Sequence, residues 1–208
     1  MKKLLSATLA VALVFGASSA FAQTMSIGAA PVGGSPAVLF DAPIGIQYDV
    51  VVTLDPGGES SSAAEFVMTE ISNDFPGIFK TFTAKFNDAL DLGVNAAGEY
   101  ILSFKGCFPD ATVEMVRLTY GNFQGGPGAD TVLTLRGLQP GDSAPSSFGG
   151  ELGFIDCSDN GIVAALGGTD GGFTGAGVEF PDGSCVLNAT AVVVDNEAGS
   201  MGQLKARF

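Results

Sequence analysis

A twelve-residue stretch with a two-residue period constrains the fold more than any other part of the sequence. In residues 44–55 (IGIQYDVVVTLD) every second residue is apolar: Ile44, Ile46, Tyr48, Val50, Val52 and Leu54. The residues between them are polar or Gly, with Val51 as the exception. Successive side chains of a β-strand point to opposite faces, whereas a helix would scatter these six around its circumference. The stretch therefore predicts a strand with one face in a core and the other in water.

Further segments with a similar period follow at short spacing, separated by turn residues. We expect strands in the ranges 63–71, 78–86, 99–105, 112–120, 131–138, 152–157 and 186–194. Residues 23–43 are rich in Gly, Pro and Ala, and they predict a loose lead-in with one edge strand near 37–40. About eight or nine strands without a long amphipathic helix indicate an all-β fold, a two-sheet antiparallel sandwich.

Two strands carry an irregularity in this pattern. Lys80 interrupts an apolar face to which Ile78 and Phe82 contribute, and this predicts an edge position or a bulge. In residues 112–120 the apolar positions change phase between Met115 and Val116. One extra residue in a strand moves all later side chains to the other face, so a bulge is expected here as well.

The first 22 residues have the three parts of a secretory signal peptide. A basic start at Lys2 and Lys3 precedes an apolar run over residues 4–15, and a small-residue cleavage pattern ends at Ala22. The apolar run is too short for a transmembrane helix. We therefore expect export to the periplasm, the cell surface or the extracellular space. The predicted organisation is a cleaved signal peptide (1–22), a β-sandwich domain (23–199) and a short C-terminal tail (200–208).

The acidic charge balance argues against several classes of partner. The chain has 9 Lys and Arg against 22 Asp and Glu, and two of the basic residues, Lys2 and Lys3, leave with the signal peptide. Because negative charge repels phosphate backbones and anionic bilayers, we expect no nucleic-acid partner and no stable membrane insertion. The sequence has no Trp and 3 Tyr, which disfavours strong glycan binding through aromatic stacking. The expected partner is an unidentified protein or glycan.

The complete absence of His removes most common catalytic machinery. Ser-His-Asp and Cys-His catalysis, His-assisted proton transfer and the usual zinc sites all require this residue. We therefore expect no enzymatic activity and no catalytic residue. One alternative is a glycoside hydrolase, which needs only two carboxylates, although no pair stands out. A second is a small outer-membrane β-barrel, because apolar and polar residues alternate up to Phe208, but short strands and the lack of Trp count against it.

Acidic residues in and beside the Gly-rich stretch 158–184 suggest a calcium site. Asp156, Asp159 and Asp170 are the candidate ligands. Calcium takes six to eight oxygen ligands, and a Gly-rich loop lets backbone carbonyls contribute some of them. The spacing does not match an EF-hand. No cofactor other than calcium is expected.

The three cysteines predict one disulfide and one free thiol in an oxidising compartment. Pairing Cys157 with Cys185 would close the Gly-rich stretch and is the expected bridge. A bridge between Cys107 and Cys157 is the alternative.

The strand pattern resembles that of cohesin-type and related sandwich modules of exported bacterial proteins. The resemblance rests on Tyr48–Asp55, Ser60–Phe66 and Tyr100–Phe104, and the tail Ser200–Phe208 is similar to short C-terminal tails on some of those proteins. It covers about half of the chain after the signal peptide and implies a cohesin-like or jelly-roll-like sandwich. The implied role is adhesion, scaffolding or ligand binding at or outside the cell surface, without any functional residue that can be carried over.

Overall fold

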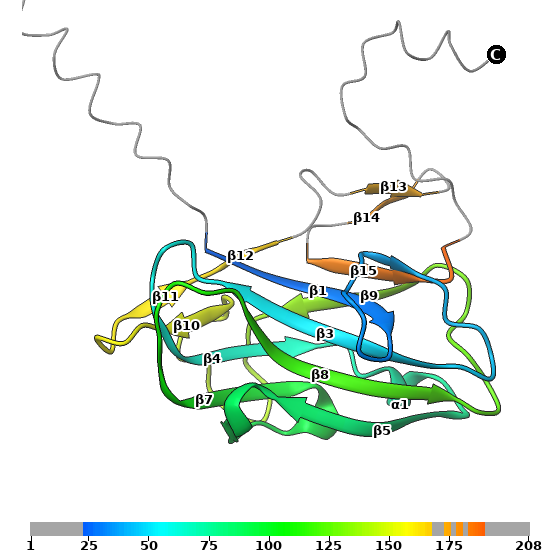
Figure 1. The fold of residues 1–208 in the computed structure, drawn as a ribbon, viewed down its shortest axis with the longest axis horizontal. Coiled ribbons are helices and arrows are strands. Elements are labelled where there is room, and N and C mark those ends of the chain that lie inside the picture. The colour runs from blue at the N-terminus through cyan, green and yellow to red at the C-terminus, as the bar shows by residue number, and fades with distance from the viewer. Residues whose placement is uncertain (1–22, 168–172, 176–177, 181–182, 190–208) are drawn as a thin grey trace, which may run out of the picture.

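The computed structural model describes residues 23–167, 173–175, 178–180 and 183–189, in which two β-sheets pack face to face (Figure 1). The predicted signal peptide, the predicted tail and Asp170 lie outside the described residues, so these three predictions stay predictions. Among the described residues, no helix has the length and apolar character needed to cross a membrane.

The first sheet is built around the strand that the two-residue period predicts. Its order is β12-β1-β3-β8-β5. The bounds are β1 Thr24–Pro31, β3 Gln47–Asp55, β5 Ile78–Lys85, β8 Val113–Asn122 and β12 Ala165–Leu166. β3 pairs antiparallel with β1 on one side and with β8 on the other, and β5 forms the free edge beside β8 (Figure 1).

The second sheet is centred on β4. Strands β7 and β6 extend it on one side of β4, while the pair β10-β11 and the series β9-β15-β2 extend it on the other. The bounds are β2 Leu39–Phe40, β4 Ser61–Met68, β6 Leu90–Asp91, β7 Glu99–Phe108, β9 Thr131–Arg136, β10 Gly153–Ile155, β11 Gly161–Val163 and β15 Ser184–Leu187.

Short elements complete the described structure. β13 (Phe173–Gly175) and β14 (Val178–Phe180) form a separate two-stranded pair. One helical turn, α1 (Ile71–Asp74), connects β4 to β5, and two 3-10 turns, η1 (Phe86–Asp88) and η2 (Asn95–Ala97), flank β6. The Gly-rich stretch, expected as a loop, thus contains several strands of two or three residues.

The core lies between the two sheets and contains the even-numbered residues of β3. Tyr48, Val50, Val52 and Leu54 are fully buried, together with Phe66 and Phe104 from the second sheet. The predicted two-sheet sandwich is confirmed. Two short pairs, β1 with β12 and β15 with β2, run parallel, so the sheets are mixed and not purely antiparallel. With these short strands included, the described residues hold fifteen strands.

Both predicted bulges are present. Val52 pairs with Val116 and Thr53 with Glu114, so Met115 is the extra residue, and both Met115 and Val116 are fully buried. On the edge strand β5, a second register shift falls between Lys80 and Phe82. This shift turns Phe82 outward, which corrects the expectation that Phe82 lies on the inner face.

The N-terminal strand β1 was not expected from the sequence. It pairs with β3 over its whole length, from Thr24 opposite Asp55 to Pro31 opposite Tyr48. Its inner face carries Met25, Ile27 and Ala29, and on its outer face Gly28 lies so close to Pro36 that a Cβ atom there would come within 2.8 Å of the Pro36 ring. Only Met25 and Ile27 are bulky, and the small residues on both faces of the second half of the strand are buried, so its period is hard to detect.

Candidate interaction surface

Three aromatic side chains on the free edge of the first sheet remain exposed to solvent. Phe79, Phe82 and Phe123 are 53%, 61% and 56% exposed. Phe79 lies opposite Gly121 and Phe82 opposite Thr119, two residues apart on β8. Since β-strands rise about 3.4 Å per residue, the two side chains are spaced by roughly 7 Å along the outer face. We call Phe79, Phe82 and Phe123 the aromatic strip.

Gly121 allows the third ring of the strip to lie flat over the sheet. A Cβ atom on Gly121 would come within 2.6 Å of the Phe123 ring, so any side chain there would displace the ring. Phe123 lies beside Phe79, with the ring centroids 6.2 Å apart and tilted by 37°. The absence of a side chain at Gly121 therefore joins Phe123 to the strip.

The inner face of β5 carries two lysines that hold this edge against the second sheet. Lys80 Nζ lies 2.5 Å from Glu70 Oε2, and Lys85 Nζ lies 2.8 Å from Asp91 Oδ2. Both carboxylates are almost fully buried. Inward-pointing charges and bulges are common means by which edge strands resist pairing with another chain. The edge therefore presents its outward side chains, and not its backbone, to a partner.

Glu70 connects β5 and β8, the two strands beside the aromatic strip, to helix α1. One of its oxygens, Oε1, accepts hydrogen bonds from the Ser72 backbone N–H, the Ser72 hydroxyl and the Tyr120 hydroxyl, the last at 2.9 Å. The other oxygen binds Lys80. Burial, and then the nearby Glu70 carboxylate, raise the pKa of Tyr120 above its ordinary value, so this phenol stays protonated and donates. One carboxylate thus fixes α1, β5 and β8 together.

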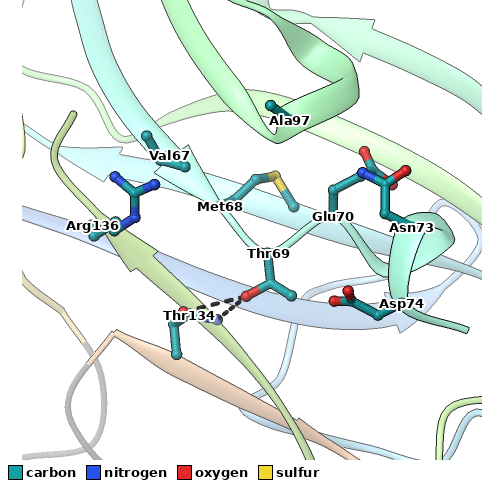
Figure 2. Close-up of a pocket in the computed structure, with 9 residues that line it drawn as sticks. All are labelled: Val67, Met68, Thr69, Glu70, Asn73, Asp74, Ala97, Thr134 and Arg136. Atoms are coloured by element: carbon teal, nitrogen blue, oxygen red, sulfur yellow. Dashed lines mark hydrogen bonds between the residues drawn. The ribbon is translucent and has the colours of Figure 1, made fainter. Parts of the chain in front are cut away.

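A small polar pocket opens beside Glu70, where β4 ends (Figure 2). Its volume is about 270 Å³, and the residues around it are Val67, Met68, Thr69, Glu70, Asn73, Asp74, Ala97, Thr134 and Arg136. Figure 2 shows Thr69 bound to Thr134 across the pocket; the Thr134 N–H donates to Thr69 Oγ1 at 3.0 Å. Typical ligand pockets hold about 300–1,000 Å³ and are mostly apolar. This pocket is smaller and polar, and the Glu70 oxygens are already occupied.

Arg136, on the rim of this pocket, is bound to a neighbouring loop. Its guanidinium forms two hydrogen bonds with the Asp142 carboxylate, at 2.5 and 2.9 Å. The Arg136 hydrogen bond, followed by that from the Gln139 N–H, lowers the pKa of Asp142 to about 2. Arg136 therefore serves as an anchor for this loop.

Two buried carboxylates on neighbouring strands bear on the hydrolase alternative. Glu65 on β4 and Glu99 on β7 are 2% and 4% exposed. Glu99 pairs with Val67, which is two residues after Glu65 on β4. Glu65 accepts hydrogen bonds from the Ser146 hydroxyl and the Ser147 N–H, and Glu99 from the Ser143 N–H and hydroxyl. Both carboxylates thus hold the loop that follows β9 against the outer face of the second sheet, where a substrate would have to displace it.

The structure places two of the three candidate calcium ligands. Asp156 closes the turn between β10 and β11: its Oδ1 accepts from the N–H groups of Ser158 and Asn160, and its Oδ2 from the Asn160 amide. The Asn160 hydrogen bonds are the main cause that lowers the pKa of Asp156. Asp159 lies in the same turn with φ +62°. Within the described part of the chain, no three His, Cys, Asp or Glu residues form a metal-binding group. The calcium site with Asp170 stays a prediction.

The disulfide joins Cys107 to Cys157, with Cα atoms 5.4 Å apart, so the expected Cys157–Cys185 pairing is wrong and the alternative is found. The reason lies in the strand order. β7 and β10 pair with opposite sides of β4, and both cysteines arrive beside the first residue of β4, Ser61. Cys185 is buried on β15, and its thiol points to Ala37 O. One disulfide and one free thiol, as predicted, are present.

Comparison with known proteins finds one structural likeness. No family model and no curated protein matches the sequence. Among solved structures, the chain is similar to a cohesin module from a family 33 glycoside hydrolase of Clostridium perfringens, with a TM-score of 0.43 and 8% identity, over 81% of this chain and 98% of that module. This neighbour is of the cohesin type that the strand pattern resembles. At this identity and TM-score, nothing about partners or activity follows from it.

Sequence reasoning did not find the aromatic strip. The alternation in 78–86 places Phe82 on the apolar face with Ile78, and none of the predicted strands includes Phe123. The bulge that Lys80 suggested was the available signal, because an extra residue after Lys80 turns Phe82 to the outer face.

Proposed function

We propose that this protein is an exported, non-catalytic β-sandwich module that binds another protein through the aromatic strip. The observation that carries the proposal is the exposure of Phe79, Phe82 and Phe123 together on the outer face of one sheet edge. Aromatic residues are enriched at protein interfaces and contribute most of the binding energy at a few central positions.

The size of the strip supports a docking surface for a partner. A fully buried aromatic side chain removes about 150–250 Å² from water, so three rings a little over half exposed offer roughly 300–400 Å². This compares with the largest apolar patches on monomeric proteins, about 300–600 Å², which are often functional. A stable interface needs about 800 Å² per partner. The strip therefore fits the apolar centre of an interface whose rim comes from the surrounding polar surface.

The non-catalytic part of the proposal rests on the occupied carboxylates. Glu65, Glu70 and Glu99 each accept at least two hydrogen bonds from neighbouring groups. A glycoside hydrolase needs one carboxylic acid free to protonate the leaving group and a second free to attack or to activate water. The sequence offers no His to take over either role.

The proposal is tested by photo-crosslinking followed by affinity measurement. A photo-reactive amino acid replaces Phe82 in the full-length protein, made in the cells that normally export it, and the crosslinked protein is identified by mass spectrometry. The matched control carries the same group at Val163, which is 55% exposed on β11 of the other sheet. We expect an adduct from position 82 that is absent from position 163.

The identified protein is then purified, and its affinity is measured by calorimetry. We expect Phe82→Ser to weaken binding at least tenfold, which is about 1.4 kcal/mol. Gly121→Ala, which displaces the Phe123 ring without removing it, should also weaken binding, whereas Val163→Ser should leave it unchanged. Phe82 and Val163 are exposed, and substitutions at such positions change stability by no more than about 0.5 kcal/mol, so a folding defect is separable for these two variants. Equal affinity for Phe82→Ser and the unaltered protein would overturn the proposal.

A further inference from the structure

The last described residues lie near the end of β8, which precedes Phe123 of the strip. After β15, the side-chain oxygen of Asn188 accepts a hydrogen bond from Ala42 N at 2.7 Å. The Ala42 carbonyl in turn accepts one from the Asn122 side-chain amide, also at 2.7 Å. Asn122 immediately precedes Phe123 of the strip. A single residue, Ala42, thus separates the point where the chain leaves the second sheet from the strand end that carries Phe123.

The sequence beyond this point contains a segment whose apolar spacing matches the strip. Nineteen residues, 190–208, follow Ala189. Among them Leu204, Ala206 and Phe208 alternate with Gln203, Lys205 and Arg207. In an extended chain, alternate side chains lie about 7 Å apart on one face, which is the spacing between Phe79 and Phe82. The segment therefore has an apolar face of the right period.

Charge favours the same contact. Residues 198–208 contain Lys205 and Arg207 and no acidic residue, while the chain as a whole has 22 acidic against 9 basic residues. Exposed Asp41 lies between β2 and β3, and exposed Asp74 is the last residue of α1, which precedes β5. Opposite charges on the rim of an interface steer association and set its orientation.

We propose that residues 201–208 of the same chain cover the aromatic strip, with Leu204 and Phe208 seated on the Phe rings. This inference rests on the proposed function, because it names the occupant of that surface when no partner is bound. Leu204 lies fifteen residues after Ala189, and a random-coil linker of that length would span roughly 20 Å on average and hold its end at an effective concentration in the millimolar range. At that concentration, a weak contact is enough to keep the tail on the strip. The tail and an external partner then compete for one surface.

Hydroxyl-radical footprinting tests this inference, because it reports the solvent exposure of individual side chains. The oxidation rates of Phe79, Phe82 and Phe123 are compared between the protein ending at Phe208 and one ending at Ser200. We expect all three rings to be oxidised several-fold faster in the shortened protein, with an unchanged rate at Val163. The double variant Leu204→Asp/Phe208→Asp should behave like the shortened protein, and the matched control Gln203→Ser like the full-length one.

Two results would overturn the inference. Equal oxidation of the strip with and without residues 201–208 would show that the tail does not cover it. Protection that disappears when the protein is diluted would show that the occupant is a second copy, since an intramolecular contact does not depend on concentration. Neither result affects the identification of a partner by crosslinking at position 82. The failure of this inference is therefore distinguishable from the failure of the proposed function.

Discussion

The Cys107–Cys157 disulfide should contribute a large share of the stability of this sandwich. Cys107 is the penultimate residue of β7, and Cys157 follows β10 by two residues. The bridge spans β4 and fixes the two strands that flank it. Replacing both cysteines by Ser removes this constraint without creating a new free thiol that could pair with Cys185.

The magnitude follows from the length of the closed loop. The two cysteines are 50 residues apart. In the chain-entropy description, a loop of this length is worth about 4 kcal/mol, within the usual range of about 2–5 kcal/mol for native disulfides. In a domain of this size each kcal/mol corresponds to about 2–4 °C in Tm. We therefore expect Cys107→Ser/Cys157→Ser to lower Tm by roughly 10 °C.

Thermal and urea unfolding with and without dithiothreitol measure this effect. The control is Cys185→Ala, which keeps the bridge and deletes one buried thiol. Reductant should destabilise the unaltered protein and Cys185→Ala but leave the double Ser variant unchanged. If the double Ser variant unfolds within about 1 kcal/mol of the unaltered protein, below the usual range for a native disulfide, the chain-entropy reasoning is refuted. If Cys185→Ala abolishes the sensitivity to reductant, the bridge itself is misassigned.

Two further predictions concern buried groups. Burial raises the pKa of the Cys185 thiol to about 12, so iodoacetamide should modify no cysteine in the native protein and one per chain in non-reducing denaturant, which mass spectrometry will count. Burial alone would raise the pKa of Asp49, but hydrogen bonds from Gly33 N–H, Thr119 and Arg117 outweigh it and lower the pKa. A lowered pKa in the folded state means stability that is present above about pH 4, the ordinary Asp pKa, and is lost as pH falls through the folded value. Asp49→Asn should therefore cost about 2–3 kcal/mol at pH 7 in urea unfolding, and the cost should shrink below pH 4; a constant difference would contradict the linkage.

The long strands were predictable because bulky residues mark their faces. β3 follows a period of two with Val51 as the exception, and the phase change between Met115 and Val116 indicated the bulge in β8 directly. The lead-in strand β1 was missed because only two bulky residues, Met25 and Ile27, mark its inner face, and because its outer face is small and covered by Pro36 over Gly28. Burial by close approach of backbone leaves little trace in a hydropathy pattern.

The disulfide and the aromatic strip could not be predicted without knowing which strands are neighbours. The pairing of Cys107 with Cys157 requires that β7 and β10 flank the same strand, which no local pattern reveals. The chain has 16 Phe residues, and their identity alone does not say which are exposed. Phe82 is exposed because a bulge turns it outward on a strand that forms a free edge, and both conditions belong to the sheet as a whole.

The way this protein covers parts of the outer faces of its two sheets bears on the role of the strip. On the first sheet, Asp49 binds Gly33 N–H and holds the segment after β1 against the outer face. On the second sheet, Glu65 and Glu99 hold the loop after β9 in the same manner. In each case a buried carboxylate on a strand captures backbone N–H groups of a covering loop, at the cost of desolvating a charge. Within the described residues no such loop is held over Phe79, Phe82 and Phe123, although the chain has the means to build one. Part of the outer face of each sheet is thus covered by a loop that a carboxylate holds, whereas the aromatic strip is open among the described residues, as the docking role proposed for it requires.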